Sequence, residues 1–555
     1  MIQHRFNPRV IRDYLASGAW QPEVDSLRLV SQEMPDRIAV VDRGRRITYA
    51  QFNELVDRAA LALLDLGIQL RATLVYQIPN WLEHYLLLHA TRRAGIRSVG
   101  ADMSLRHRDL AWVLDATGAQ WLVLPQRFRH FDFSRMARDL QAERPDLRVV
   151  LVGAVDEDDP TAGAVIFNEL LARQHTVGDA QARLAARAFA PDEVNAFKLT
   201  SGSTGRPKLA MQLGYQAVAR QTALVERFQL SADDVFLIMA PLTGGGGRVL
   251  GVWSAHPLGA RTVLLDRFDP SEALRLIERE RVTVTSGVPT QYVKLLEAMD
   301  SQPHDLSSLR AVFYTGSRLP AEVGRRYAED LGVALLGVYG TQDAGIFSCT
   351  AVTDDLDVAL QTVGQPFPDV DAQVQPEDGT PLPADAAGEL RFGGPGVLLA
   401  GYYQGPDATA RAFDADGYFS TGDFGAVRSD GRVVVKGRRG ETINRGGYKV
   451  YPAEIEELLL EHPAIKHAAV VGYPDPVFGQ RACLFAVSSG QTLPCLEDVV
   501  RFLRTKGVAP YKLPETLRIL DELPLIGDTQ KIDRRGLEAL AMDGVQTGLP
   551  PVGSR

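Results

Sequence analysis

The sequence contains few cysteines and no long hydrophobic run. Its three cysteines, Cys349, Cys483 and Cys495, lack the spacing of a metal site, so we expect reduced, structural thiols in a reducing compartment. No stretch approaches the roughly 18–20 apolar residues that span a membrane. The first residues also lack the apolar segment of a signal peptide. These absences predict a cytoplasmic protein without a membrane span.

An excess of positive charge is also missing. The formal net charge is −9 and the pI is about 5.7, whereas a dedicated nucleic-acid binder is more often basic. We therefore expect no nucleic-acid partner, although a local basic patch around a phosphorylated ligand is compatible with this balance. Hydrophobic residues make up 45% and charged residues 23% of the 555 residues. This is the composition of an ordinary globular protein that is too long for a single core.

Patterns of buried strands alternate with patterns of amphipathic helices along most of the chain. The expected helix at 50–67, for example, precedes an expected strand at 74–78. Such alternation predicts an α/β fold with layered parallel sheets covered by helices. Residues 363–438 show short strands with glycine turns and predict a β subdomain. We therefore expect a large N-terminal domain, 1–438, and a small, mobile α+β C-terminal domain, 439–555.

The most informative stretch is Leu199–Lys208, which reads LTSGSTGRPK. Glycine permits close backbone approach, successive amides and hydroxyls can surround phosphate oxygens, and Lys208 adds a point charge. A Gly/Ser surface turn is the alternative, and Pro207 before the lysine excludes a P-loop. We expect a helix over about 213–227, whose N-terminal dipole would add to phosphate binding. The predicted phosphate-binding residues are Thr200, Ser201, Gly202, Ser203, Thr204, Gly205 and Lys208.

Further motifs follow this loop in a fixed order. They are GSRLP at 316–320, YGTQD at 339–343, TGD at 421–423, GR at 437–438, NRGGYK at 444–449 and TQK at 529–531. Together with the loop, they resemble the acyl-adenylate-forming superfamily, which includes acyl- and aryl-CoA ligases, peptide-synthetase adenylation domains and luciferases. The resemblance runs from the middle of the chain almost to its end.

The resemblance implies a role for each motif. The catalytic residues would be Lys208, Asp343, which would hold Mg²⁺, and Lys531, which would bridge the acid and the α-phosphate. The implied nucleotide contacts, besides the loop, are Gly316, Ser317, Tyr339, Gly340, Thr341, Gln342, Asp423 and Arg438. The implied thiol tunnel consists of Arg445, Gly446, Gly447 and Lys449. The implied acid pocket, which includes a run of four glycines, consists of Met239, Pro241, Gly244, Gly245, Gly246 and Gly247.

The resemblance also implies a two-step reaction. A carboxylate would attack the α-phosphate of Mg·ATP, giving an acyl-adenylate and pyrophosphate. The thiol of CoA, or of the phosphopantetheine of a carrier protein, would then displace AMP. The small domain would rotate about Gly440 between the steps and exchange Lys531 for the 444–449 loop. The oligomeric state stays open, with a dimer among the options.

The chain departs from the family pattern at several positions. Gln342 and Asp343 stand where Thr and Glu are usual, Gly440 replaces Asp or Lys at the hinge, and Gln530 replaces a Gly. Asp343 keeps the carboxylate that Mg²⁺ prefers and Gln342 keeps a hydrogen-bonding group, so these changes do not by themselves predict loss of activity.

Two stretches resemble aryl-acid enzymes such as 2,3-dihydroxybenzoate–AMP ligases: Pro79-Asn80-Trp81 and Ile443–Gly447. Those enzymes carry His-Asn after Met-Ala, where this chain carries Pro241-Leu242, which argues against an ordinary catechol-acid pocket. The leading hypothesis is an acid–thiol ligase for an aromatic or related small acid. One alternative is activation of another oxyanion, such as nitrite, for N–N bond formation. The other is a non-catalytic nucleotide-binding homologue.

Overall fold

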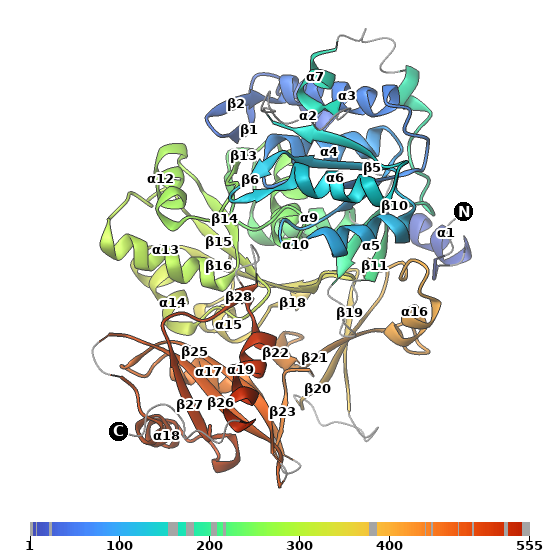
Figure 1. The fold of residues 1–555 in the computed structure, drawn as a ribbon. Coiled ribbons are helices and arrows are strands. Elements are labelled where there is room, and N and C mark those ends of the chain that lie inside the picture. The colour runs from blue at the N-terminus through green and yellow to red at the C-terminus, as the bar shows by residue number, and fades with distance from the viewer. Residues whose placement is uncertain are drawn as a thin grey trace.

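The computed structural model (Figure 1) describes most of the chain. The described residues are 4–6, 8–20, 25–153, 165–173, 182–200, 208–214, 218–376, 386–438, 440–445, 448–475, 477–490, 493–526 and 531–546. No helix in these ranges is both long and apolar enough to cross a bilayer.

The larger of the two main sheets has nine strands in the order β18-β17-β16-β15-β14-β12-β13-β1-β2. Its central strands pair in parallel, and β2, β17 and β18 add antiparallel edges. The strands are β1 (Ile38–Asp42), β2 (Arg45–Thr48), β12 (Val235–Ile238), β13 (Arg261–Leu264), β14 (Val284–Gly287), β15 (Ala311–Thr315), β16 (Ala334–Thr341), β17 (Gly345–Cys349) and β18 (Gln365–Pro366).

The second main sheet has seven strands in the order β11-β10-β4-β3-β5-β8-β9. All its pairings are parallel except that of β10 with the edge strand β11. The strands are β3 (Thr73–Tyr76), β4 (Arg97–Gly100), β5 (Trp121–Pro125), β8 (Arg148–Val152), β9 (Val165–Ile166), β10 (Val194–Thr200) and β11 (Lys208–Leu213). A short hairpin, β6 (Arg127–Phe128) with β7 (Phe131–Asp132), lies apart from it.

Helices cover and join the two sheets (Figure 1). α3 begins at a capping box in which Thr48 and Gln51 satisfy each other's backbone N–H groups, and it packs on α4, which is buried along most of its length. The helices of this part are α1 (Pro8–Ala16), α2 (Ser26–Glu33), α3 (Tyr49–Asp65), α4 (Leu82–Arg93), α5 (His107–Thr117), α6 (Phe133–Glu143), α7 (Phe167–Ala172), α9 (Val218–Phe228), α10 (Gly245–Arg248), η2 (Val249–Ala255), α11 (His256–Leu258), α12 (Pro270–Glu280), α13 (Pro289–Ser301), α14 (Ala321–Arg325), η3 (Arg326–Asp330) and α15 (Leu356–Gln361).

Two smaller sheets follow in the chain. One has four antiparallel strands, β19 (Asp371–Gln375), β20 (Gly388–Gly393), β21 (Phe419–Val427) and β22 (Val433–Arg438), with α16 (Pro406–Ala412) between β20 and β21. The other has five, β23 (Ile443–Arg445), β24 (Tyr448–Val450), β25 (Ile465–Asp475), β26 (Gly479–Ser488) and β27 (Thr516–Leu520). The remaining elements are α17 (Pro452–Leu459), α18 (Leu496–Thr505), η4 (Pro510–Lys512), α19 (Arg534–Gln546) and the hairpin of β28 (Leu525–Ile526) with β29 (Lys531–Ile532).

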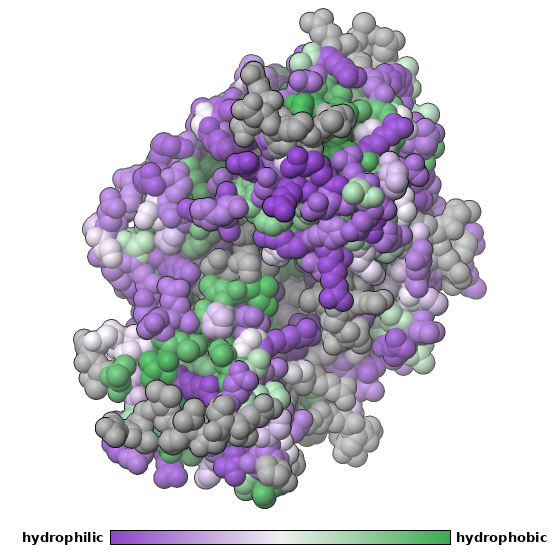
Figure 2. All heavy atoms as spheres, viewed as in Figure 1, coloured by the Kyte–Doolittle hydropathy of each residue, from purple (hydrophilic) through white to green (hydrophobic). Residues whose placement is uncertain are grey.

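The C-terminal sheet buries its own apolar side chains on both faces. Ile455, Leu484 and Leu503 belong to one cluster, and Phe485 and Leu537 to another. Figure 2 shows that hydrophilic residues cover most of the visible face, while hydrophobic ones gather where the C-terminal elements meet the larger body. The boundary at 438/439 and the mobility of the small domain stay predictions.

The α/β prediction is confirmed, with one correction beside the phosphate loop. The helix expected over about 213–227 is wrong at its start, because Lys208–Leu213 is the strand β11 and the helix α9 begins at Val218. Thr200 and Lys208 are therefore partners in an antiparallel ladder, and no helix follows the loop directly. The chain before β1 contains two helices, α1 and α2. The three cysteines, which all lie in the described ranges, form no disulfide; Cys349 and Cys483 are buried and Cys495 is exposed.

Candidate active site

Lys531 lies beside the loop that follows β15. A Cβ atom on Gly316 would be 3.1 Å from Lys531 Cε and 3.4 Å from its Nζ. Gly316 itself has φ +93°, a conformation that glycine adopts without strain. Lys531 is an exposed residue, but desolvation by the surrounding protein, with Arg438 acting in the same direction, lowers the pKa of Lys531 below its usual value. The structure therefore brings together two site residues that lie far apart in the sequence.

Asp423 connects two other predicted nucleotide contacts. Tyr339, near the end of β16, donates a hydrogen bond from its hydroxyl to Asp423 Oδ2 at 2.7 Å. Arg438 is the ladder partner of Asp423 between β22 and β21, and its Nε lies 3.3 Å from Asp423 Oδ1. Burial raises the pKa of Asp423, while the charge of Arg438 opposes this shift. The carboxylate is thus held in one orientation, with acceptor capacity left for a ligand's hydroxyl groups.

Tyr402, which the sequence reasoning missed, connects the predicted phosphate lysine with the predicted metal carboxylate. Its hydroxyl donates to Asp343 Oδ2 at 2.5 Å, and Lys208 Nζ lies 4.6 Å from the centre of its ring. Tyr402 reaches this place through a β-bridge with Ala210 of β11. No local pattern marks this tyrosine, because its partners lie about 60 and 190 residues away.

The residues present fit Mg²⁺ that arrives with a nucleotide. The described part of the chain contains no cluster of three or more His, Cys, Asp or Glu side chains that could enclose a metal ion. Asp343 offers one carboxylate, whose oxygens already accept hydrogen bonds from Tyr402 and from the Ala344 amide. Mg²⁺ commonly takes one or two carboxylates and completes its shell with water and phosphate oxygens. Asp343 would hold the ion, which would neutralise phosphate charge.

The four glycines after β12 begin a helix. Gly244 is the N-cap of α10, and a Cβ on Gly247 would lie 2.6 Å from the carbonyl oxygens of both Ala240 and Pro241. Gly247 therefore allows the helix to approach the preceding turn closely. Asn80 fixes the same turn, since its Nδ2 donates to Ala240 O at 3.0 Å and its Oδ1 accepts from Leu242 N at 2.9 Å.

The predicted acid-pocket residues are divided between two cavities. Gly245 lines one that also includes Thr341 and Gln342. Met239 and Pro241 line another, which contains Asn80 and Asp102. Gly244 and Gly246 line neither of these cavities, although a Cβ on Gly246 would lie 3.1 Å from Thr315 Cγ2.

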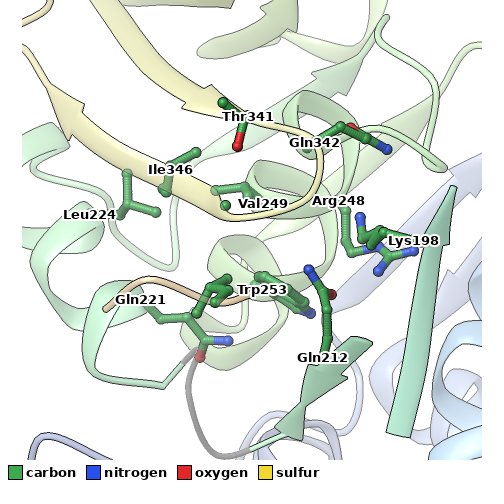
Figure 3. Close-up of a pocket in the computed structure, with 13 residues that line it drawn as sticks. Lys198, Gln212, Gln221, Leu224, Arg248, Val249, Trp253, Thr341, Gln342 and Ile346 are labelled. Atoms are coloured by element: carbon green, nitrogen blue, oxygen red, sulfur yellow. The ribbon is translucent and has the colours of Figure 1, made fainter. Parts of the chain in front are cut away.

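Figure 3 shows the first of these cavities, which contains charged residues that the sequence reasoning did not assign. Lys198 of β10 and Arg248 at the end of α10 lie at one end, and Leu224 and Ile346 lie at the other. A lysine between Phe197 and Leu199 in a buried strand is the signal that could have identified the first of them. Gln342 lines the cavity too, and its amide donates to Thr243 O at 3.1 Å.

The other predicted nucleotide-binding residues show fewer contacts that bear on their roles. Ser317 is exposed, and a Cβ on Gly340 would lie 2.3 Å from Gly345 O, so Gly340 allows β16 and β17 to pair closely. Thr200 is a buried strand residue. The other predicted loop residues, Ser201, Gly202, Ser203, Thr204 and Gly205, lie outside the described residues, as do Gly446, Gly447 and the side chain of Lys449.

The C-terminal side of the site contains the predicted hinge and one predicted tunnel residue. A Cβ on Gly440 would meet no atom within 4 Å. Arg445 forms an ion pair with Glu515 and lies over the ring of Phe478 at 5.0 Å. Their roles in domain rotation and thiol binding stay predictions. Arg534 pairs with Glu456, with both Nη–Oε distances at 2.7 Å, and connects α19 to α17 near Lys531.

Comparison with known proteins identifies the family. The sequence profile described as AMP-binding enzyme matches residues 27–403, and that of the AMP-binding enzyme C-terminal domain matches residues 454–529. The chain belongs to the AMP-binding enzyme family. The predicted recognition is confirmed: the protein is an adenylate-forming, ATP-dependent ligase of this family.

Individual relatives of this AMP-binding enzyme match almost end to end. A 2-hydroxy-7-methoxy-5-methyl-1-naphthoate–CoA ligase of Streptomyces carzinostaticus is 35% identical and covers 95% of each chain. A medium-chain fatty-acid–CoA ligase of Escherichia coli (strain K12) is 32% identical over 94% of this chain and 91% of its own. The solved structure of an amide bond synthetase of Marinactinospora thermotolerans is 26% identical, with a TM-score of 0.80 over 93% of this chain and 99% of its own.

Proposed function

We propose that this enzyme adenylates a small aromatic or related carboxylic acid and transfers the acyl group to the thiol of CoA or of a carrier protein. The position of Lys531 beside Gly316 carries the proposal. Arg438 and Asp423 lie close enough to the ammonium group of Lys531 for their charges to shift its pKa, and Asp423 contacts both Tyr339 and Arg438. This grouping supports adenylation, because a fixed ammonium can stabilise charge that develops at the α-phosphate.

Each residue has a defined task in the proposed first step. Asp423 would accept hydrogen bonds from the ribose hydroxyls, and Lys208 would contact the β- and γ-phosphates. An acid oxygen attacks the α-phosphorus, the bond to pyrophosphate breaks, and an acyl-adenylate forms. Lys531 would stabilise the charge that develops between the acid oxygen and the α-phosphate, a fixed electrostatic contribution that costs no reorganisation during the reaction. Mg²⁺, when bound, would neutralise negative charge on the departing pyrophosphate.

The second step would leave AMP and a thioester. The thiol sulfur attacks the acyl carbon and AMP departs with the bonding electrons. Two relatives named as CoA ligases support a thiol acceptor. The naphthoate ligase supports an aromatic acid. The lack of a disulfide among Cys349, Cys483 and Cys495, all in the described ranges, supports action in the reducing cytoplasm.

An acid-dependent pyrophosphate release assay tests the proposal. Aromatic acids, fatty acids and nitrite are supplied with Mg·ATP, and products are identified by mass spectrometry with and without CoA. We expect release with a carboxylic acid, and a loss of about 10²–10³-fold in Lys531→Ala, as for removal of one group that stabilises a transition state. Lys506→Ala is the control, because Lys506 pairs with Glu461 on the surface. Release with nitrite alone, or ATP binding without turnover of any acid, would overturn the proposal.

A further inference from the structure

Two buried cations lie side by side in the cavity of Figure 3. Lys198 and Arg248 are each 6% exposed, and their nitrogen-bearing ends lie close together in the view. No ion pair joins either of them to an Asp or Glu of the described chain, and Arg248 Nε is buried without a hydrogen-bond partner. The ring of Trp253 lies 6.0 Å from the Arg248 guanidinium.

Such a pair is unfavourable unless an anion joins it. Burying a charge without a partner is costly, and buried charges in proteins are normally paired. Burial and the neighbouring Arg248 hold the pKa of Lys198 well below its usual value, and burial lowers the pKa of Arg248. The stretches 201–207 and 215–217, which lie outside the described residues close to β10 and β11, contain no acidic residue in the sequence. These stretches therefore cannot supply a carboxylate that would neutralise Lys198 and Arg248.

The lining of the cavity combines the two kinds of surface that an organic acid needs. It is apolar at Leu224, Val249 and Ile346, and polar at the cationic end. A third cavity, distinct from the one lined by Met239 and Pro241, shares Arg248 with the cavity of Figure 3 and has no acidic lining residue. Its other polar lining residues are His89, Arg92, Ser98, Asn195 and Gln212.

This cationic pair is separate from the catalytic lysine. Lys531 lies beside Gly316, and the charges that shift its pKa are Arg438, Glu441 and Asp423. The charge that shifts the pKa of Lys198 is Arg248. An acid whose reacting carboxylate lies near Lys531 therefore leaves Lys198 and Arg248 available for a different group.

We infer that the acid pocket accepts a dianionic acid, whose second carboxylate binds between Lys198 and Arg248 while the first is adenylated. The inference rests on the proposed adenylation function and specifies its substrate class. The apolar lining residues Leu224, Val249 and Ile346 favour an aromatic or short aliphatic spacer between the two carboxylates. Arg248 can bind a carboxylate through two parallel hydrogen bonds, and Lys198 adds a point charge.

Matched acids test the inference. Benzoate is compared with isophthalate and terephthalate, and hexanoate with adipate, by acid-dependent pyrophosphate release. We expect kcat/KM for the best diacid to exceed that of its monoacid by at least about tenfold. Lys198→Met and Arg248→Met should each reduce this ratio by about 10–100-fold, mainly through KM, as expected when one charged hydrogen-bonding partner is lost. Arg275→Met, at an exposed arginine of α12, should leave the ratio unchanged.

A stability measurement separates recognition from folding. Removal of an unpaired buried cation should leave the melting temperature of the ligand-free protein unchanged or raise it, and isophthalate should raise that of the wild type more than that of either variant. Arg248→Lys, which keeps the charge, should retain part of the preference. Monoacid turnover that needs Lys531 but shows no diacid preference would overturn the inference and leave the proposed function standing. Absence of turnover with every carboxylic acid would overturn both.

Discussion

Arg318 Nη1 lies 2.6 Å from Glu457 Oε2, so an ion pair joins the loop after β15 to helix α17 of the C-terminal sheet. Lys466 and Glu297 form a second contact of this kind at 3.0 Å, between β25 and α13. Both pairs hold the C-terminal part in the arrangement that places Lys531 beside Gly316. Their side chains are partly exposed, so each pair is worth about 0.2–1 kcal/mol.

Breaking the first pair should act on one half-reaction. We expect Glu457→Gln to slow acyl-adenylate formation by no more than about fivefold, because about 1 kcal/mol is lost from the arrangement that carries Lys531. Thioester formation from a preformed acyl-adenylate should not slow. Single-turnover assays of each half-reaction measure this, with Glu461→Gln, at a surface pair with Lys506, as the control. Equal slowing of both half-reactions would contradict the expectation.

The lowered pKa of Lys531 predicts the pH dependence of adenylation. The lysine would act as an ammonium, and desolvation by the surrounding protein makes this form easier to deprotonate than that of a lysine fully surrounded by water. The single-turnover rate should therefore fall as the pH rises through a pKa below the ordinary value of 10.5. Lys531→Arg should lose this alkaline fall, whatever its residual rate, because a guanidinium stays charged. A fall at the same pH in both proteins would assign it to another group.

Gly316 should be sensitive to a single methyl group. Gly316→Ala places a Cβ 3.1 Å from Lys531 Cε at a residue with φ +93°. The alanine should strain the backbone, because its φ is positive, and should displace the Lys531 side chain. We expect a stability loss of about 1–2 kcal/mol and at least tenfold slower pyrophosphate release. Gly332→Ala provides a matched control, since its φ is +67° and its Cβ would meet nothing within 4 Å. A similar loss of activity in the control would show that backbone strain alone explains the effect.

The Tyr402 hydroxyl should orient the carboxylate that is predicted to hold the metal. Tyr402→Phe removes the donor that holds Asp343 Oδ2 at 2.5 Å. We expect the Mg²⁺ concentration for half-maximal activity to rise about 10-fold, equivalent to about 1.4 kcal/mol, and the melting temperature to fall, because a hydrogen bond to a charged group contributes about 1.5–3 kcal/mol to stability. Tyr403→Phe is the control, because the Tyr403 ring packs on Phe197. The same Mg²⁺ shift in both variants would rule out this role.

The central strands of the sheets could be predicted from the sequence, whereas the edge strand β11 could not. Buried parallel strands such as Leu74–Tyr76 are continuous apolar runs with a clear signal. Lys208–Leu213 mixes apolar and polar residues over six positions, too short a run for periodicity to distinguish a strand from a helix. The strand identity of β11 comes from its pairing with β10, which is tertiary information.

The site shows the same division. Lys531, Asp423 and Tyr339 could be predicted because short motifs in a fixed order identify them. Tyr402 and the pair Lys198–Arg248 carry no such motif, since their importance comes from what folding brings next to them. Sequence order can show that a residue type is present, whereas the absence of a partner for a buried charge is visible only in three dimensions.

The pairing of Thr200 with Lys208 has a consequence for what holds the phosphate lysine in place. The two residues are opposite one another in the β10–β11 ladder, so both ends of the intervening segment are anchored to the same sheet edge. The backbone position of Lys208 is therefore set by strand pairing, and this pairing also continues through Leu209 and Ala210. A change that weakens the β10–β11 ladder should displace the lysine even when every residue of the phosphate-binding motif is kept.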